Sequence, residues 1–267
     1  MKKLVYRYMF TLTAPNLGVF KGSGAFGKVY EATWKDERVA VKVVNTTISG
    51  YTQVLQELHA LTYIPCEFNV CKVFGSYLHD EDSIGIIMEL CDFDLFDYIS
   101  KTGPLAELQA KPIFRDVANS LNFMHVNGLY HCDIKLDNIM IKDGVVKIVD
   151  FGLMNSSQSA GSMNYAPPET WTKGKPGSHT DVWSLAICVY ACLTNGFPWE
   201  IAHTTDIRYT TIISKNVSTV EAIFLYYKRS CSFSLELIDL LNNMMITSPN
   251  RRISMEQVYN SSWLVEK

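Results

Sequence analysis

The chain has 267 residues, of which 48% are hydrophobic and 19% are charged, with a formal net charge of -3. This composition is that of a globular protein and excludes a disordered chain. The net charge argues against a general nucleic-acid binder, which needs a strongly basic face. The apolar stretches are too short to span a bilayer, and the first residues lack the apolar core of a secretory signal.

Cysteine usage points to a reducing compartment. The chain has seven cysteines, and none of them form a CxxC pair. An odd number without regular spacing indicates reduced thiols and not a disulfide framework. We therefore expect the protein in the cytoplasm or the nucleus.

The first third of the chain has the pattern of β-strands, with short apolar runs between turn residues. Residues 51–64 differ, because their apolar side chains recur at helical spacing. The expected strands are residues 16–21, 28–34, 38–44, 70–78 and 84–90, with a hairpin turn at residues 35–37.

After Leu90 the pattern changes to longer helices. The expected helices are residues 106–126, 181–193, 235–245 and 255–263. Residues 181–193 are nearly all apolar, which is typical of a buried helix. The sequence therefore predicts an α+β protein, with a small β-rich part followed by a larger helical part.

Three glycines, Gly22, Gly24 and Gly27, lie between two expected strands. Because glycine has no Cβ atom, such a loop can approach phosphate oxygens and offer them amide donors. A dinucleotide-binding fold would need a helix directly after the glycines, whereas residues 29–33 have a strand pattern. A hairpin over a nucleotide and an ordinary glycine-rich hairpin both fit this motif on its own.

Lys42 follows the apolar run Val39-Ala40-Val41. An ammonium group there needs an anionic partner, because burying it unpaired would be costly. Nucleotide phosphates and the carboxylate of Glu57 on the expected helix are candidates. The alternative is a surface lysine at a strand end and a solvated glutamate.

Polar residues gather in the middle of the chain. Residues 131–138 are His-Cys-Asp-Ile-Lys-Leu-Asp-Asn, and an apolar run then leads to Asp150-Phe151-Gly152. With the glycine loop and the lysine before them, these motifs resemble the eukaryotic protein kinase family almost to the C-terminus. The resemblance implies one bilobal domain over residues 1–267, with an N-lobe of about residues 14–90 and a C-lobe of about residues 91–267.

This resemblance implies a transferase that moves the γ-phosphate of ATP to a protein hydroxyl, with Mg²⁺ as a further cofactor. Asp133 would orient the substrate hydroxyl and accept its proton, while Asn138 and Asp150 would bind Mg²⁺. Lys42 would hold the α- and β-phosphates and pair with Glu57. The residues implied to bind ATP are Gly22, Ser23, Gly24, Ala25, Phe26, Gly27, Val29, Ala40, Lys42, Glu57, Met88, Glu89, Cys91 and Met140.

The adenine pocket has a separate set of counterparts in the family. Met88 corresponds to the gatekeeper residue, and residues 89–91 correspond to the hinge whose backbone bonds the adenine edge. Val29, Ala40 and Met140 would enclose the ring.

The resemblance also implies structural roles. Asp181 would brace the catalytic loop, and Arg252 would pair with Glu169. The stacked apolar spine of the family would comprise Leu61, Val73, His131 and Phe151. His131 is therefore expected to be a packing residue and not a general base.

Two residues resemble the serine/threonine branch of the family. Lys135 follows Asp133 by two positions, as does the lysine that bridges the transferring phosphate and the catalytic aspartate in that branch. Ser162 stands in a Gly-Ser-Met-Asn-Tyr stretch similar to the branch's GTxxY motif, and its hydroxyl can bond near Asp133. Dual specificity stays open as an alternative. Residues 195–209 resemble checkpoint effector kinases and SH3-binding-domain kinases.

Four features depart from the family pattern. Cys132 replaces the arginine that binds a phosphate on the activation segment of many regulated kinases. Pro167 replaces the usual alanine, residues 150–169 form a short activation segment, and residues 91–95 form a shortened hinge. A redox role for Cys132 is an alternative, although buried cysteines are usually inert.

Two rival functions are a pseudokinase scaffold and a kinase-fold enzyme for small molecules. The complete catalytic set disfavours the first rival, and Lys135 with Ser162 disfavours the second. The expected partners are protein substrates with serine or threonine acceptors, and neither nucleic acid nor a membrane, for a monomeric enzyme. Asp94 and Asp137 predict a preference for arginine or lysine two to three positions before the acceptor. The alternative is that Asp94 binds the ATP ribose and Asp137 is solvated.

Overall fold

The computed structural model describes residues 13–24, 27–49, 54, 58, 64–65, 67–155, 162–172 and 174–265. The chain forms two compact units. The first comprises Met1–Asp92 with Ile141–Gly152, and the second comprises Phe93–Met140 with Leu153–Lys267. Among the described residues, no helix is both long enough and apolar enough to cross a membrane.

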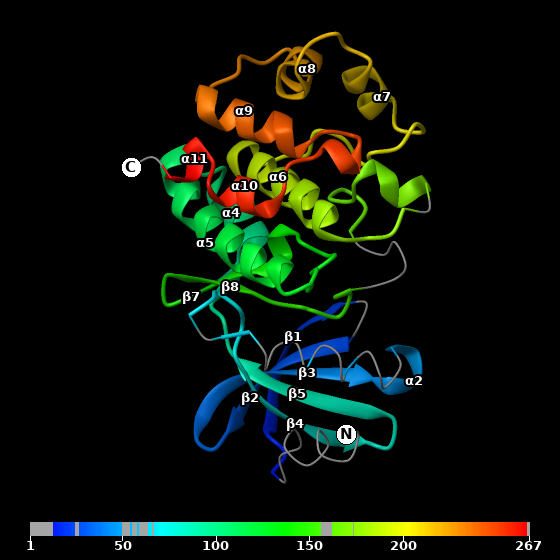
Figure 1. Cartoon of the computed structure of the whole chain (residues 1–267). Coiled ribbons are helices and arrows are strands. Elements are labelled where there is room, and N and C mark those ends of the chain that lie inside the picture. The colour runs from blue at the N-terminus through cyan, green and yellow to red at the C-terminus, as the bar shows by residue number, and fades with distance from the viewer. Residues whose placement is uncertain are drawn as a thin grey trace. The chain divides into compact units, whose positions relative to one another are not determined.

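The first unit is built on a five-stranded antiparallel sheet with the order β1-β2-β3-β5-β4 (Figure 1). Its strands are β1 (Asn16–Gly24), β2 (Gly27–Trp34), β3 (Glu37–Asn45), β4 (Val73–Asp80) and β5 (Ser83–Glu89). The predicted hairpin is confirmed: Lys35 and Asp36 both have positive φ and connect β2 to β3. Two such residues match the twist of the flanking strands.

Apolar side chains cover both faces of this sheet. Val39 and Val41 on β3 pack into one buried cluster with Tyr77 and Ile87. Val44, on the opposite face because side chains alternate along a strand, belongs to a second cluster. The other buried members of the second cluster are Val54, Leu58, Ile84 and Ile86.

The helix expected over residues 51–64 falls mostly outside the described residues. Val54 and Leu58 are described, and both are helical and buried. The short helix α2 (Thr46–Ser49) precedes them. The strand expected from Val70 begins three residues later, at Val73, because Val70 instead forms an isolated parallel bridge with Ile148.

A second sheet has the strand order β6-β7-β8, with β6 (Phe93–Asp94), β7 (Ile139–Lys142) and β8 (Val145–Ile148). Asp143 and Gly144, both with positive φ, form the turn between β7 and β8. This hairpin brings the chain to Asp150, two residues after β8.

The second unit is helical. Its helices are α4 (Leu95–Thr102), α5 (Glu107–Val126), α6 (Ser178–Thr194), α7 (Ile207–Ile213), α8 (Thr219–Tyr226), α9 (Leu235–Met244), α10 (Met255–Tyr259) and α11 (Ser262–Val265). As predicted, α6 is buried nearly throughout, and it packs against α4, α5, α9 and α10. Single 3₁₀ turns occur at Leu136–Asn138, Pro168–Thr172 and Pro249–Arg251.

One predicted helix was wrong in its extent. Residues 255–263 form two helices, because Asn260 ends α10 and Ser261 begins the next turn. The Asn260 side chain donates to the Glu256 carbonyl, and the Ser261 carbonyl accepts from the amides of Leu264 and Val265. The Asn260 side chain thus competes with the helix for a backbone carbonyl, as asparagine does at helix ends.

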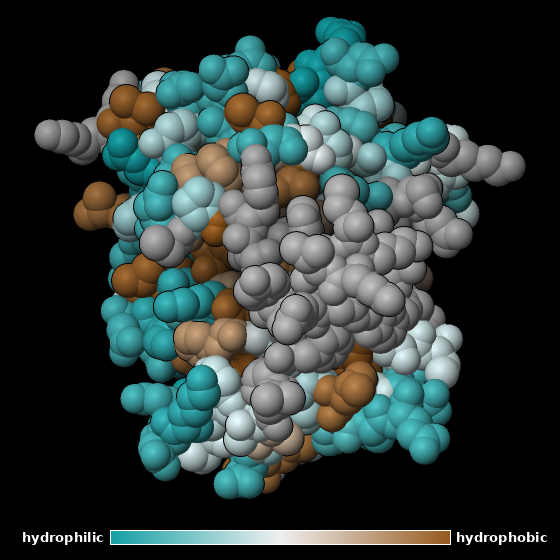
Figure 2. Space-filling model, turned by 60° about the horizontal axis from the view of Figure 1, so that its bottom comes forward, coloured by the Kyte–Doolittle hydropathy of each residue, from teal (hydrophilic) through white to brown (hydrophobic). Residues whose placement is uncertain are grey.

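The surface mixes polar and apolar residues. Figure 2 shows hydrophilic residues over much of the face drawn there, with hydrophobic patches between them. Large exposed apolar residues include Val19, Phe20, Leu78, Leu108 and Leu235. Exposed apolar residues of this kind are normal on folded proteins and do not by themselves mark a site.

Candidate active site

The glycine loop lies at the turn between β1 and β2, where Gly22 pairs with Val29 and Gly24 pairs with Gly27. The predicted loop residues Ala25 and Phe26 lie outside the described residues. Among the described residues, a Cβ atom on Gly22 or Gly24 would meet nothing within 4 Å, whereas one on Gly27 would clash with the Val43 carbonyl oxygen. The fold therefore requires glycine at position 27. At the other two positions glycine leaves the backbone open to an approaching group.

Lys42 projects from β3 and is only 6% exposed. Its Nζ atom lies 2.7 Å from Oδ1 of Asp150, which has a φ of 64°. Both residues belong to the first unit, so the structure pairs the predicted phosphate-binding lysine with a predicted metal ligand. The predicted partner Glu57 lies outside the described residues.

The predicted hinge begins at the end of β5, where Met88 pairs with Ala40 across the sheet. The Glu89 carboxylate is buried and accepts a 2.7 Å hydrogen bond from the amide of Lys72. It also lies 3.1 Å from Nζ of Lys147. The Glu89 side chain thus ties the end of β5 to Lys72 and Lys147. The predicted contact of Glu89 with adenine concerns its backbone and not this carboxylate.

The amide of Cys91 is a candidate donor to a ligand. Within the described part of the chain it donates to no protein group, while the next amide, that of Asp92, donates to the Ile141 carbonyl. The predicted hinge therefore offers one unused backbone donor. Met140, one of the residues predicted to enclose the adenine ring, belongs to the second unit.

The catalytic loop places four predicted groups together in the second unit. Oδ1 of Asp133 accepts from the Ser162 amide at 3.1 Å, and Oδ2 lies 3.2 Å from Nζ of Lys135. The same ammonium group donates to the Ser162 hydroxyl at 3.1 Å. Nδ2 of Asn138 donates to the Asp133 carbonyl at 2.8 Å. Oδ1 of Asn138, the atom predicted to bind Mg²⁺, makes no hydrogen bond among the described residues.

Asp181 on α6 braces this loop, as predicted. Its fully buried carboxylate accepts from the amides of His131 at 2.9 Å and Cys132 at 2.8 Å. Cys132 has a φ of 64°, a left-handed conformation that is rare outside glycine. The two amide bonds offset the cost of this conformation.

Sequence analysis missed a third partner of Asp181. Nε2 of His125 lies 2.8 Å from Oδ2 of Asp181. His125 sits in the last turn of α5, and no motif includes it. The only indication in the sequence is that His125, a polar residue, stands where the helical spacing of α5 predicts a core position.

The predicted pair of Glu169 and Arg252 is confirmed. The two side chains form a buried bidentate ion pair, with bonds of 2.6 and 2.9 Å. The guanidinium also donates to the His179 carbonyl and stacks over the Trp183 ring. Both residues are buried, so this pair is part of the core of the second unit.

The histidine of the catalytic loop is fully buried. Nδ1 of His131 accepts a weak bond from the Asp133 amide at 3.3 Å, consistent with packing. Of the other predicted spine residues, Val73 and Phe151 belong to the first unit, and Leu61 lies outside the described residues.

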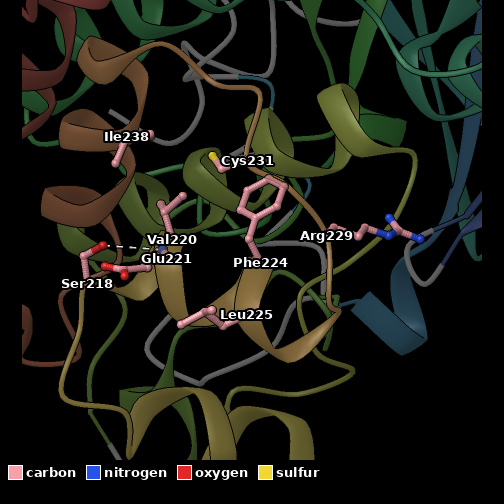
Figure 3. Close-up of a pocket in the computed structure, with 8 residues that line it drawn as sticks. All are labelled: Ser218, Val220, Glu221, Phe224, Leu225, Arg229, Cys231 and Ile238. Atoms are coloured by element: carbon pink, nitrogen blue, oxygen red, sulfur yellow. Dashed lines mark hydrogen bonds between the residues drawn. The ribbon is translucent and has the colours of Figure 1, made fainter.

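A cavity of about 340 Å³ opens elsewhere in the second unit (Figure 3). Its lining comes from α8, α9 and the connecting segment: Ser218, Val220, Glu221, Phe224, Leu225, Arg229, Cys231 and Ile238. In the close-up the Arg229 side chain extends away from the others, and Ser218 bonds the backbone at Glu221. None of these residues belongs to the predicted site.

Comparison with known families identifies this arrangement. The family model described as "Protein kinase domain" matches residues 18–264. The chain belongs to the protein kinase family. Its relatives place it in the serine/threonine branch. The narrower resemblance to checkpoint effector and SH3-binding-domain kinases stays a prediction.

Several curated kinases are similar over most of the chain. The rice "Serine/threonine protein kinase OSK3" (Oryza sativa subsp. indica) is 30% identical over 263 residues, covering 93% of this chain and 49% of its own. The "Carbon catabolite-derepressing protein kinase" of Saccharomyces cerevisiae is 27% identical, covering 91% and 38%. The human "NUAK family SNF1-like kinase 1" is 29% identical, covering 91% and 37%. The kinase chain thus spans half or less of the length of these relatives.

Proposed function

We propose that this kinase transfers the γ-phosphate of ATP to serine or threonine hydroxyls of protein substrates. The observation that carries the proposal is the cluster of Asp133, Lys135 and Ser162, with carboxylate, ammonium and hydroxyl within 3.4 Å of one another. Phosphoryl transfer depends mainly on positioning and charge neutralisation, which is what such a cluster provides.

Asp133 would align the substrate hydroxyl and accept its proton. Two donors from Ser162 and the ammonium of Lys135 hold its carboxylate in place. Lys135 would also neutralise charge on the transferring phosphate, because its ammonium is a mobile point charge beside the carboxylate. A lysine in this role supports the assignment to serine and threonine acceptors.

The first unit has groups that fit ATP. The open backbone at Gly22 and Gly24 suits phosphate oxygens, and Lys42 supplies a buried cation. The unused amide of Cys91 suits an acceptor nitrogen on the adenine edge. An unpaired backbone donor is expected to find a partner, and a bound nucleotide would supply it.

Two oxygen donors fit Mg²⁺, which would neutralise phosphate charge when bound. Asn138 is oriented by its bond to the Asp133 carbonyl, so its side-chain oxygen faces away from that bond. Asp150 is held by Lys42 at 2.7 Å. Amide and carboxylate oxygens are the ligands that this hard cation prefers.

We also propose a preference for basic residues upstream of the acceptor. Burial raises the pKa of Asp94, and the negative charges of Asp97 and Asp137 add to the shift. Mutual repulsion among these carboxylates favours the approach of a substrate cation. One oxygen of Asp94 already accepts from the Asp97 amide as the N-cap of α4, which leaves the other for a substrate.

Protein substrates are the partners that this proposal requires, and the enzyme would act as a monomer. The net charge of -3 supports a protein partner over a nucleic acid. The decisive test incubates the purified chain with Mg-ATP and a mixed protein substrate and identifies the phosphorylated residues. Phosphoserine or phosphothreonine is expected. Nucleotide binding without any transfer would favour a pseudokinase, and transfer to small molecules alone would reject the proposal.

The upstream preference is tested with a degenerate peptide library. Selection for arginine or lysine two to three positions before the acceptor is expected, and it should weaken in Asp137→Ala and at raised salt. A library without upstream basic selection would refute the preference without touching the transfer activity.

A further inference from the structure

Two cysteines of the first unit meet beside the predicted adenine-binding backbone. The ladder between β4 and β5 continues to a bond from the Glu89 amide to the Lys72 carbonyl, at 2.9 Å. Cys71 directly precedes Lys72, and Cys91 comes two residues after Glu89, so both leave the same end of the ladder. The Cys71 thiol lies 3.8 Å from the carbonyl oxygen of Glu89, two residues before Cys91.

The two thiols have different environments. Cys71 is buried, and its amide is tied to the Ile148 carbonyl at 2.9 Å, whereas Cys91 is partly exposed. The neighbouring Cys91 thiol, burial and the Glu89 charge raise the pKa of Cys71. The neighbouring Cys71 thiol lowers the pKa of Cys91, aided by Lys142 and Lys147. The reachable sulfur is thus the one that favours the thiolate, which is the reactive form.

We propose that Cys71 and Cys91 form a peroxide-sensitive dithiol that closes to a disulfide at the hinge. The Cys91 thiolate attacks hydrogen peroxide, which forms an S–O bond, breaks the O–O bond and releases hydroxide. The Cys71 thiol then attacks the sulfenic sulfur, forming the S–S bond and releasing water. The two thiols lose two electrons and two protons, and one peroxide becomes two waters.

The backbone can accommodate this bond. A disulfide needs Cα atoms within about 7 Å of each other. Paired Cα atoms of an antiparallel ladder are about 5 Å apart, and Cys71 and Cys91 lie only one and two residues beyond the bonded pair of Lys72 and Glu89. The Glu89–Lys72 bond fixes the two strand ends, so closure needs side-chain rotation and a small shift of residues 90–92.

The bond has a consequence that rests on the proposed function. The amide of Cys91 is the unused donor assigned to the adenine edge, and fixing its side chain to Cys71 would turn that amide. Loss of one such hydrogen bond weakens binding by about tenfold. Peroxide should therefore reduce nucleotide affinity, and a dithiol reductant should restore it.

The first experiment follows the bond itself. The full chain is treated with hydrogen peroxide, the remaining thiols are alkylated, and tryptic peptides are analysed by mass spectrometry. A cross-link between the peptides carrying Cys71 and Cys91 is expected. It should disappear in Cys71→Ser and, independently, in Cys91→Ser.

A matched control distinguishes neighbouring thiols. Cys66 shares a tryptic peptide with Cys71, so Cys66→Ser should keep the cross-link, as should Cys231→Ser, which removes an exposed thiol of the second unit. Recovery of Cys91 as sulfinic or sulfonic acid without a cross-link would overturn the proposal. A cross-link that persists in Cys71→Ser would do so too.

The second experiment measures binding of a fluorescent ADP before and after peroxide. The dissociation constant should rise about tenfold in the parent chain and stay constant in Cys71→Ser, which keeps the Cys91 amide. A disulfide that forms without changing affinity would reject the regulatory role alone. A reduced parent chain that binds no nucleotide would reject the proposed function and leave the dithiol standing.

Discussion

The two units hold their charged groups in different ways. In the first unit, Glu31 pairs with Arg38 at the surface of the sheet, at 2.6 Å and largely in contact with water. In the second unit, the equally short pair of Glu169 and Arg252 is buried and has further partners. Distance alone therefore says little about what an ion pair contributes, because solvent screens the first and not the second.

The same contrast separates the candidate functional groups of the first unit from those of the second. The second unit surrounds Asp133 with donors from its own chain, and Asp181 braces the loop from within the core. The first unit presents open glycine backbone and an unused amide at Cys91. The groups of the second unit are preorganised by the protein, whereas the proposed nucleotide would supply partners for those of the first.

The largest expected effect is on kcat, from a change in the preorganised catalytic loop of the second unit. Asp133→Asn removes the proposed proton acceptor and one carboxylate charge beside Lys135, so kcat should fall by about 10²- to 10⁴-fold. Phosphate transfer to a serine peptide under saturating Mg-ATP measures this. Asp143→Asn, a matched change at an exposed turn, should leave kcat unchanged. Parent-level activity in Asp133→Asn would contradict the assigned role.

The next effect compares the two ion pairs directly. Arg252→Ala leaves Glu169 buried without its partner and should lower the free energy of unfolding by about 3 to 5 kcal/mol. Arg38→Ala, at the exposed pair with Glu31, should change it little. Urea unfolding monitored by tryptophan fluorescence would measure both. Equal losses would show that burial does not distinguish the pairs.

The glycines test whether the open backbone serves the fold or a ligand. Gly27→Ala places a Cβ atom against the Val43 carbonyl and should destabilise the first unit by about 1 to 3 kcal/mol. The Cβ atom of Gly24→Ala meets no atom of the described residues within 4 Å, so stability should hold while KM for ATP rises. If Gly24→Ala changed stability and not KM, the glycine would serve the hairpin alone.

A pH dependence is expected in the second unit. Burial lowers the pKa of His179, which lies near Glu169 and Arg252. Because the unfolded state binds the proton more tightly, stability should fall as pH drops through the unfolded value of about 6.5. Thermal unfolding between about pH 8 and pH 5 measures this. His179→Gln should flatten the part of the slope near pH 6, and an unchanged slope would assign it to other groups.

The smallest effect concerns regulation. Without an arginine at position 132, activity should not depend strongly on phosphorylation of the activation segment. A variant with alanine at Ser156, Ser157 and Ser159 should retain most of its activity towards a serine peptide. A collapse of activity that acidic residues at the same three positions restore would mean that a cation other than residue 132 binds a phosphate on the activation segment.

The motifs predicted much of the fold because the relevant patterns are local. Alternation along β2 and β3 and the turn at Lys35 and Asp36 are properties of short segments. The end of α10 was missed although its cause, Asn260 followed by two serines, is equally local. In that case the apolar spacing was given more weight than the polar residues that interrupt it.

Contacts between distant segments were harder to foresee. The approach of Lys42 to Asp150 joins residues 108 positions apart, and neither motif alone contains that information. His125 and Cys71 lie outside every motif. Neither the contact of His125 with Asp181 nor the proximity of Cys71 to Cys91 could therefore be predicted from residue spacing. Such pairs depend on how strands and helices pack, which composition and periodicity do not specify.

The brace on the catalytic loop has one more consequence. The Asp181 carboxylate accepts hydrogen bonds from the main-chain amides of His131 and Cys132, and these bonds do not involve the side chains of the two residues. The geometry of the loop is thus indifferent to what position 132 carries, provided the residue tolerates a positive φ. Position 132 becomes a design variable separate from catalysis. Replacing Cys132 by arginine would make activity respond to a phosphate on the activation segment while the backbone of the loop stays unchanged.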